Sequence, residues 1–275
     1  MELAIEQELV IGKVLDIRDS QPRIGTRKLH GMLHDFMLSH GIKMGRDALF
    51  DLLAVHNLLI RRRKKKGPKT TDGTGAPKWP NLLEDMAITK IQQVWATDIT
   101  YVQREKEGWY YLMALVDLFS HQIVGWHLSE RMTASACLKA LQMALEAHPQ
   151  LPKGLIHHSD RGSQYRSDDY LEQLKKHHIK VSMCKKPQEN GVSERLNGIL
   201  KNELLDGRPL PSNLEQARAK VAAAIATYNC NRPHDSLGGL FPQQVHQGKQ
   251  PLPSLWKKRE KRWLKEKKNK ELQEY

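Results

Sequence analysis

The order of secondary-structure signals after Trp79 constrains the fold of this 275-residue chain more than any other feature. Three stretches rich in β-branched and aromatic residues, 94–103, 108–120 and 121–129, follow one another with short turn-like breaks and predict an antiparallel meander. Helix, strand, helix, strand and two helices are then expected at 133–148, 155–160, 167–178, 179–184, 192–205 and 213–229. This order predicts an α/β fold, a mixed five-stranded sheet flanked by helices, as a ribonuclease-H-like core requires.

The first 60 residues predict a separate, all-helical unit. Apolar residues recur at helical spacing around Leu29 and again around Leu49, and Gly41 and Gly45 bracket a short connection. Two short helices joined in this way resemble a helix-turn-helix, whose second helix would begin near Arg46 and offer that residue to DNA. An ordinary helical hairpin is the alternative that the pattern leaves open.

Charge is distributed unevenly along the chain. Residues 1–78 hold 15 Lys and Arg against 9 Asp and Glu, residues 79–250 hold 20 against 18, and residues 251–275 hold 9 against 4. Two basic ends around a nearly neutral middle are typical of a protein that binds a polyanion, most often nucleic acid. An anionic membrane surface is the rival partner, but the basic runs lack a clean amphipathic face.

A run of six cations separates the two predicted folded units. These residues repel one another, and the following Gly, Pro and Thr offer no apolar face, so 61–90 is predicted to be a linker that also follows a phosphate backbone. The expected DNA contacts in it are Arg61, Arg62, Arg63, Lys64, Lys65 and Lys66. The predicted division is therefore a helical domain at 1–60, this linker, a catalytic core at 91–250 and a basic tail at 251–275.

Two classes of protein are disfavoured by composition. No apolar run approaches the ~20 residues that a membrane-spanning helix needs, and the acidic start of the chain does not match a secretory signal. The three cysteines, Cys137, Cys184 and Cys230, are odd in number and far apart, which fits reduced thiols in a cytoplasmic protein. No Cys-x-x-Cys pair supports a structural zinc site.

Three carboxylates stand at positions that suit phosphodiester chemistry. Asp98 lies inside an apolar strand, where a carboxylate is costly unless it is paired or bound to metal. Asp160 ends the fourth predicted strand, and ligands of α/β sheets collect beyond such strand ends. Glu194 begins the helix after the fifth strand. The alternatives are a salt bridge for Asp98, a turn aspartate for Asp160 and a solvated helix end for Glu194. A metal site is favoured only when the three carboxylates are taken together.

The helix that carries Glu194 is predicted to bury Val192, Leu196, Ile199 and Leu200. A neighbouring stripe then holds Glu194, Asn197, Gly198 and Lys201 at helical spacing. This stripe offers a carboxylate, an amide, a bare backbone and a lysine, and Asn197 on it is a candidate DNA contact. An ordinary solvated helix face is the alternative.

Four segments together resemble the catalytic protein of insertion-sequence-three family transposases, in the retroviral-integrase-like DDE superfamily. They are WATDITYV, HHSDRGSQYRSDDYLEQLKKHHIKVSM, ENGVSERLNGILKNEL and YNCNRPHDSLGGLFPQQVH, and they occur in the expected order from Trp95 to His246. The segments IGTRKLHGML and LIRRRKKK also resemble the N-terminal helix-turn-helix region of that family.

The resemblance implies that Asp98, Asp160 and Glu194 hold two Mg²⁺ or Mn²⁺ ions and that Lys201 contacts DNA. It also implies cleavage of transposon ends followed by strand transfer, a homo-oligomer on DNA in the bacterial cytoplasm, and a separately encoded upstream helix-turn-helix partner. One departure is a spacing of 33 residues between Asp160 and Glu194, two fewer than is usual, with the shortening in the loop 185–191. A decayed copy acting as a DNA-binding regulator, or a nuclease of the same fold, is the alternative function.

Overall fold

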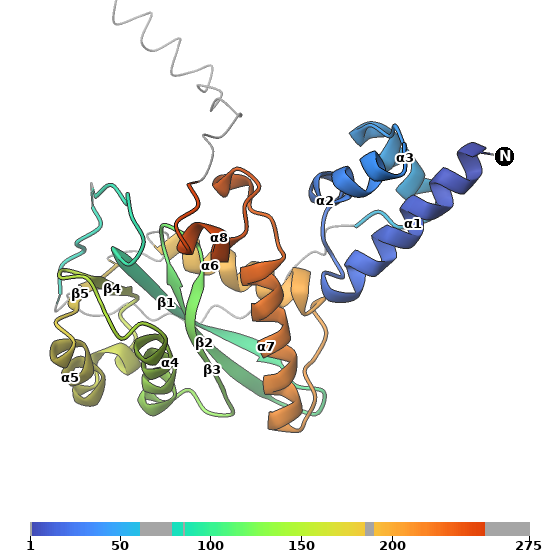
Figure 1. The fold of residues 1–275 in the computed structure, drawn as a ribbon. Coiled ribbons are helices and arrows are strands. Elements are labelled where there is room, and N and C mark those ends of the chain that lie inside the picture. Colours follow the sequence, from blue (N-terminus) through green and yellow to red (C-terminus); the bar gives the residue numbers. More distant parts are fainter. Residues whose placement is uncertain (1, 61–78, 85, 185–189, 251–275) are drawn as a thin grey trace, which may run out of the picture.

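The computed structural model describes residues 2–60, 79–84, 86–184 and 190–250. Three N-terminal helices lie to one side of a larger body made of a sheet and its flanking helices (Figure 1). The basic run 61–66 and the segment 251–275 lie outside the described residues. No helix within the described ranges has the length and apolar character that a membrane crossing needs.

The N-terminal helices are α1 (Glu2–Ser20), α2 (Thr26–Ser39) and α3 (Arg46–Val55). They form a small core of their own, because apolar side chains three and four residues apart point inward from each helix. Leu29, Leu33 and Leu53 are among its fully buried members. The connection from α2 to α3 turns at Gly41, whose φ of 69° suits a residue without a Cβ.

The body is built on a five-stranded sheet in the order β3-β2-β1-β4-β5. The strands are β1 (Val94–Gln103), β2 (Trp109–Asp117), β3 (Ile123–Ser129), β4 (Ile156–Ser159) and β5 (Lys180–Met183). β1, β2 and β3 form the expected antiparallel meander, whereas β4 pairs in parallel with β1 and with β5. This topology confirms the ribonuclease-H-like expectation.

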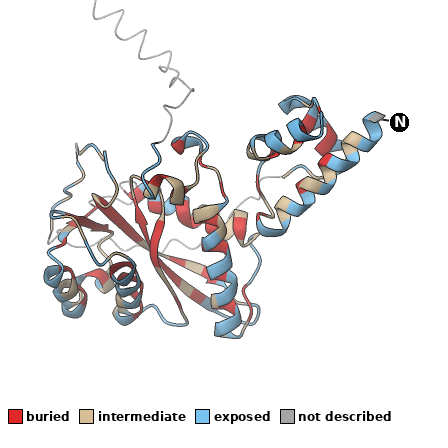
Figure 2. Cartoon of the chain, in the orientation of Figure 1, coloured by how far each residue is buried: buried red, intermediate tan, exposed pale blue. Residues whose placement is uncertain are grey.

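Helices cover both faces of the sheet, and alternate strand residues supply the two cores (Figure 2). α4 (Ala134–Ala147) and α5 (Asp168–Lys176) pack on the face that carries Trp95 and Met113. α6 (Gly191–Ile199) and α7 (Leu214–Cys230) pack on the opposite face, where Ala96 and Leu112 lie. Four short elements complete the body: the 3-10 helices η1 (Ser163–Arg166) and η4 (Asp235–Leu237), the π-helical turn η3 (Leu200–Leu204), and α8 (Pro242–His246).

Close packing of α4 depends on a glycine in β3. A Cβ at Gly125 would collide with the Ala140 carbonyl oxygen and with Ala144. Because glycine has no Cβ, β3 can lie closer to the backbone of α4 than it could with any other residue at this position. No disulfide joins Cys137, Cys184 and Cys230 in the described part of the chain.

Candidate active site

Asp98 lies in the middle of β1, at the centre of the sheet, on the face covered by α6. Its two oxygens are held by different donors. The backbone N–H of Ile99 donates to Oδ1 at 2.9 Å, and the side-chain amide of Asn197 donates to Oδ2 at 2.8 Å. A half-buried carboxylate with both oxygens held in this way is fixed in orientation before any ligand arrives.

Asp160 follows β4, the parallel neighbour of β1. The strand register pairs Ala96 with His158, so Asp98 and Asp160 each lie two residues beyond that pair. Equal steps along parallel strands bring side chains to the same face and the same height, which places the two carboxylates beside each other. The N–H of Gly162 donates to Asp160 Oδ1 at 2.9 Å and fixes it in the turn after the strand.

The two aspartates are electrostatically coupled. The pKa of Asp98 is raised from 3.8 to about 7, by burial first, by the neighbouring Asp160 carboxylate second, and by Glu194 to a smaller extent. The hydrogen bonds from Ile99 and Asn197 act in the opposite direction without cancelling the shift. A like-charged pair in a partly dry position favours either a proton or a cation between its members.

Glu194 stands in the first turn of α6, and two buried amides attach this helix to β1. The Asn190 amide donates to the Thr97 carbonyl oxygen at 3.0 Å, four residues before Glu194, and Asn197 reaches Asp98 three residues after it. The Glu194 side chain itself is exposed. Among the described residues, no three His, Cys, Asp or Glu side chains are gathered closely enough to hold a metal ion as they stand.

Comparison with known proteins places this site in a family. Two models described as "Integrase core domain" match residues 89–188 and 175–242. An "Insertion element IS600 uncharacterized 31 kDa protein" from Shigella sonnei is 38% identical over 234 residues, which cover 84% of this chain and 83% of that protein. "Transposase InsF for insertion sequence IS3A" from Escherichia coli is 41% identical over 191 residues, covering 68% of this chain and 65% of that relative.

The chain belongs to the insertion-sequence-three family of transposases. The family resemblance drawn from the four motifs is thereby confirmed. Among solved structures, the catalytic core domain of HTLV-2 integrase in complex with magnesium is 25% identical. That match covers 57% of this chain and 97% of the viral one, with a TM-score of 0.46.

The active-site helix of this family member differs from the expected single helix over 192–205. α6 ends at Ile199, and a π-helical turn follows from Leu200 to Leu204. Val192, expected in the buried stripe, is 37% exposed, whereas Ser193, Leu196 and Asn197 are buried. The buried stripe is therefore rotated from the one expected, because the helix packs through its polar Ser193 and Asn197 as well as its leucines.

Asn197 and Lys201 consequently lie in different surroundings. Asn197 is only 5% exposed and its amide donates to Asp98, and its contact with DNA stays a prediction. Lys201 is half-buried in the π-helical turn, where its carbonyl oxygen accepts from the N–H of Gly207 at 2.7 Å. The regular spacing that grouped it with Glu194 stops before it, since a π turn is wider than an α turn.

The residues that flank Asp160 support the strand end. Tyr170 and His157 share a hydrogen bond of 2.8 Å, and His158 Nδ1 lies 2.9 Å from the Ser182 hydroxyl oxygen, all with buried partners. The Arg161 guanidinium Nε donates to the Cys184 carbonyl oxygen at 3.1 Å. These contacts are internal packing around the end of β4.

Asn190 is a site residue that sequence reasoning did not select. Its signal was an Asn-Gly pair at the start of a helix, which ordinarily indicates a cap. In the structure its side chain makes no capping bond and instead donates across to β1. Only the three-dimensional approach of α6 to β1 distinguishes this role from an ordinary cap.

The expected DNA contacts outside the core remain predictions. Arg46 does begin α3, but its guanidinium lies 2.8 Å from the Asp47 carboxylate beside it. This pairing raises the pKa of Arg46. Arg61, Arg62, Arg63, Lys64, Lys65 and Lys66 lie outside the described residues.

Proposed function

We propose that the chain is a metal-dependent DNA transposase that cuts transposon ends and joins the resulting 3′-OH to target DNA. Asp98, Asp160 and Glu194 would hold two Mg²⁺ or Mn²⁺ ions, since carboxylate oxygens suit both metals. Such ions, when bound, neutralise charge on a phosphate and activate the attacking oxygen.

The coupled pair Asp98 and Asp160 carries this proposal. Parallel strands place the two carboxylates together, and burial and mutual repulsion hold the pKa of Asp98 near 7. A structural salt bridge would have supplied a basic partner. No salt bridge joins Asp98 to a described Lys or Arg, and within the described ranges its side-chain oxygens accept only from the Asn197 amide and the Ile99 N–H. The donor set is therefore all oxygen and anionic, which fits a hard divalent cation.

Glu194 is the third carboxylate of the proposed metal site, and it lies on a helix that is attached to β1. Asn190 and Asn197 hold α6 on both sides of Glu194, so only its own side chain has to rotate toward the aspartates. The exposed position leaves Glu194 accessible to a DNA phosphate. This geometry orders the backbone of the site in advance and leaves one flexible ligand to close it.

The proposed reaction needs no covalent enzyme intermediate. Water first attacks a phosphodiester at the transposon end and releases a 3′-OH, and that hydroxyl then attacks a target phosphodiester in the same way. Both steps are in-line phosphoryl transfers at one site. The residues of the chain orient the phosphate and the metal-binding oxygens, and none has to act as a nucleophile.

DNA is the proposed partner, bound as transposon end and as target. The basic run 61–66 and the basic segment 251–275 would contact its backbone. A homo-oligomer on DNA, a cytoplasmic location and a requirement for an upstream helix-turn-helix protein are further parts of the proposal, and they rest on membership of the family.

A strand-transfer assay tests the proposal. The chain is incubated with a labelled, pre-cleaved 3′-OH end of its own element and target DNA, with Mg²⁺ or with EDTA. Joined products are expected with Mg²⁺ only, and Asp160→Asn and Glu194→Gln should each reduce them by at least a hundredfold, because one ligand is lost without a change of shape.

Glu215→Gln is the matched control, since Glu215 is likewise an exposed glutamate in the first turn of a helix. It should retain wild-type joining. Joining that persists in EDTA or in Asp160→Asn would refute the mechanism. DNA binding without joining by the wild-type chain would instead favour the decayed regulator, unless addition of the upstream partner restores it.

A further inference from the structure

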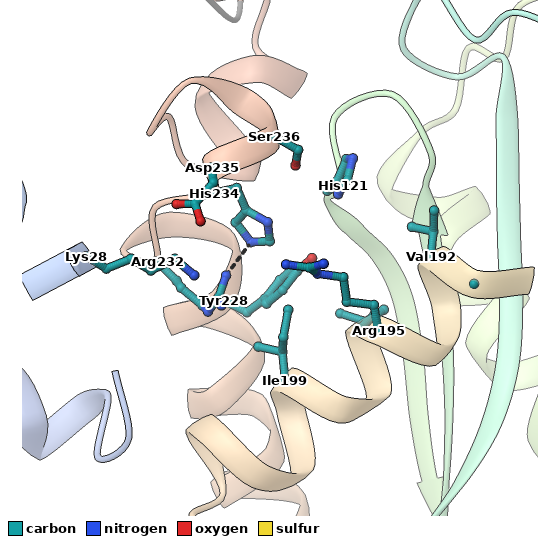
Figure 3. A pocket seen from close by; sticks show the side chains of 12 residues that line it. Lys28, His121, Val192, Arg195, Ile199, Tyr228, Arg232, His234, Asp235 and Ser236 are labelled. Atoms are coloured by element: carbon teal, nitrogen blue, oxygen red, sulfur yellow. Dashed lines mark hydrogen bonds between the residues drawn. The ribbon is translucent and has the colours of Figure 1, made fainter. Parts of the chain in front are cut away.

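A cavity of about 430 Å³ lies on the side of α6 away from Asp98. It is enclosed by α2 of the N-terminal helices, the turn between β2 and β3, α6, and the segment from α7 to η4 (Figure 3). Its lining residues are Lys28, His121, Gly191, Val192, Arg195, Leu196, Ile199, Tyr228, Arg232, His234, Asp235 and Ser236. Its volume falls within the range of small-ligand sites.

The charges around this cavity sum to a net positive charge. Lys28 and Arg195 approach it from opposite sides (Figure 3), and among the described residues no side-chain hydrogen bond or ion pair joins either of them to a partner. Burial and the Arg232 and Arg195 guanidiniums lower the pKa of Lys28, whereas the Glu203 and Asp235 carboxylates act in the opposite direction. Three cations, Lys28, Arg195 and Arg232, stand against two carboxylates, Glu203 and Asp235, and the remaining positive charge would favour an anion.

Arg232 is different, because it already has a partner. Its Nε and Nη2 donate to the two oxygens of Glu203 at 2.8 and 2.9 Å, and its Nη1 lies 3.1 Å from His234 Nε2. Only 3% of Arg232 is exposed. It therefore forms the fixed floor of the cavity, while Lys28 and Arg195 remain available to a ligand.

The remaining wall is made of flat rings and apolar side chains. Tyr228 and His234 are buried, and their rings meet edge to face with centroids 4.9 Å apart. The half-buried His121 ring, 5.8 Å from that of His234, is therefore the aromatic surface that a base can reach. Burial and the Arg232 charge lower the pKa of His234, so its ring is neutral at physiological pH. Val192 and Ile199 complete this wall from α6.

We propose that this cavity receives one unpaired nucleotide of the DNA strand held at the active site, which extends the proposed function. Cations beside aromatic surfaces are the combination that binds single-stranded nucleic acid, the cations taking the phosphate and the rings the base. A recessed cavity suits a nucleotide turned out of the helix, whereas the backbone of an intact duplex needs a broad outer surface. Asp235 and Ser236 at its rim can accept from or donate to a base edge.

The position of the cavity relates it to catalysis. Glu194 and Arg195 are consecutive residues of α6, with Glu194 serving the aspartates and Arg195 the cavity. A strand whose reacting phosphate lies at Glu194 can therefore place a neighbouring nucleotide beside Arg195. Because Lys28 belongs to α2, the same nucleotide would also join the N-terminal helices to the body.

Binding of the full chain to two DNA ends in EDTA tests the proposal without cleavage. One end is a blunt duplex and the other carries a short single-stranded extension with 2-aminopurine at its first unpaired position. The wild-type chain should bind the extended end about tenfold more tightly and quench the 2-aminopurine by stacking. The double variant Lys28→Gln and Arg195→Gln should lose both the preference and the quenching while keeping its affinity for the blunt duplex.

Lys139→Gln is the matched control, because Lys139 is an exposed lysine on α4, on the other face of the sheet. Its preference and quenching should equal those of the wild type, and thermal melting should be the same for all chains. A wild-type chain without preference, a double variant that keeps it, or an equal loss on both ends would overturn the unpaired-nucleotide site. A chain that shows the preference but never joins strands would refute only the transposase reaction.

Discussion

At the scale of single residues, Asp98 is a carboxylate whose charge the folded protein opposes. Its pKa lies near 7 in the folded chain, because of burial first and Asp160 second, and near 3.8 when the chain unfolds. Ionisation therefore destabilises the folded state as pH rises from about 4 to 7. Above pH 7 the loss of unfolding free energy caused by ionising Asp98 reaches its full size, on the order of a few kcal/mol, because each unit of pKa shift corresponds to about 1.4 kcal/mol.

Asp98→Asn should consequently raise the melting temperature of the metal-free chain at pH 8 while it abolishes strand transfer. Asn197 can accommodate the new amide by turning its own, since its Oδ1 has no hydrogen-bond partner among the described residues. The gain should shrink as pH falls from 7 toward 4. Calorimetry across this range measures it, and a lower melting temperature at pH 8 would show that the Asp98 charge stabilises the fold.

The same residue shows what the sequence could and could not predict. An aspartate amid apolar β-branched residues is conspicuous, and the order of the elements places it on the central strand, so Asp98 and Asp160 were predictable as a pair. The hydrogen-bond partner of Asp98 could not be predicted. Helical spacing alone allows the stripe that carries Asn197 to face either DNA or the sheet, and only packing in the folded chain selects the sheet.

At the scale of elements, strands were easier to predict than the active-site helix. β1 spans the predicted 94–103 because its apolar and β-branched residues leave one interpretation. The change from α to π geometry at Leu200 has no such local signal. It depends on Leu200 and Leu204 both reaching the core around α7, which is a property of the tertiary structure.

The contact between β3 and α4 supplies an element-scale prediction. Gly125→Ala should destabilise the chain by about 1–3 kcal/mol, because its Cβ would meet the backbone of Ala140, which cannot move aside as a side chain can. Gly31→Ala in α2 is the matched control. Nothing lies within 4 Å of its added Cβ, so it should stabilise its helix by up to about 1 kcal/mol. Urea unfolding of both variants measures the contrast, and equal effects would contradict the close-packing argument.

At the scale of the whole molecule, buried histidines make the fold sensitive to acid. Burial is the main cause of a lowered pKa at His121, His127, His157, His234 and His246. A histidine whose folded pKa is lowered binds more protons in the unfolded chain, so stability rises with pH and is lost as pH falls below about 6.5. Protonation of these rings therefore favours the unfolded chain over the folded one.

His157 offers the sharpest test, because its pKa is lowered to about 3. Between pH 6.5 and 3 it should account for a loss of about 1.4 kcal/mol of unfolding free energy per pH unit. His157→Gln keeps an amide near the position of Nε2 as a hydrogen-bond partner for Tyr170 and should flatten the pH dependence by one proton, whereas His56→Gln at an exposed helix end should not. Denaturant unfolding at several pH values provides the measurement, and parallel curves for His157→Gln and the wild type would refute the assignment.

Charge at the molecular scale also locates where DNA affinity should reside. Residues 1–60 hold 7 basic and 8 acidic residues, so the net charge of +6 over 1–78 comes entirely from 61–78, with 8 basic residues and 1 acidic residue. On α3, Arg46 is paired with Asp47, and the carboxylates Asp47 and Asp51 are both exposed. We therefore expect few phosphate contacts from the helix-turn-helix-like segment and propose the run from Arg61 to Lys66 as the stronger source.

Replacing these six cations with Gln should weaken DNA binding and flatten its salt dependence. Each lost phosphate contact on duplex DNA reduces the slope of log affinity against log salt by about 0.9, since fewer counterions are released. Lys175→Gln with Lys176→Gln, at the end of α5 on the sheet face opposite α6, is the control and should leave the slope near that of the wild type. Anisotropy titrations between low and physiological salt give the slopes. An unchanged slope in the six-residue variant would place DNA contact elsewhere and would turn attention to Lys28 and Arg195, which line the cavity beside α6.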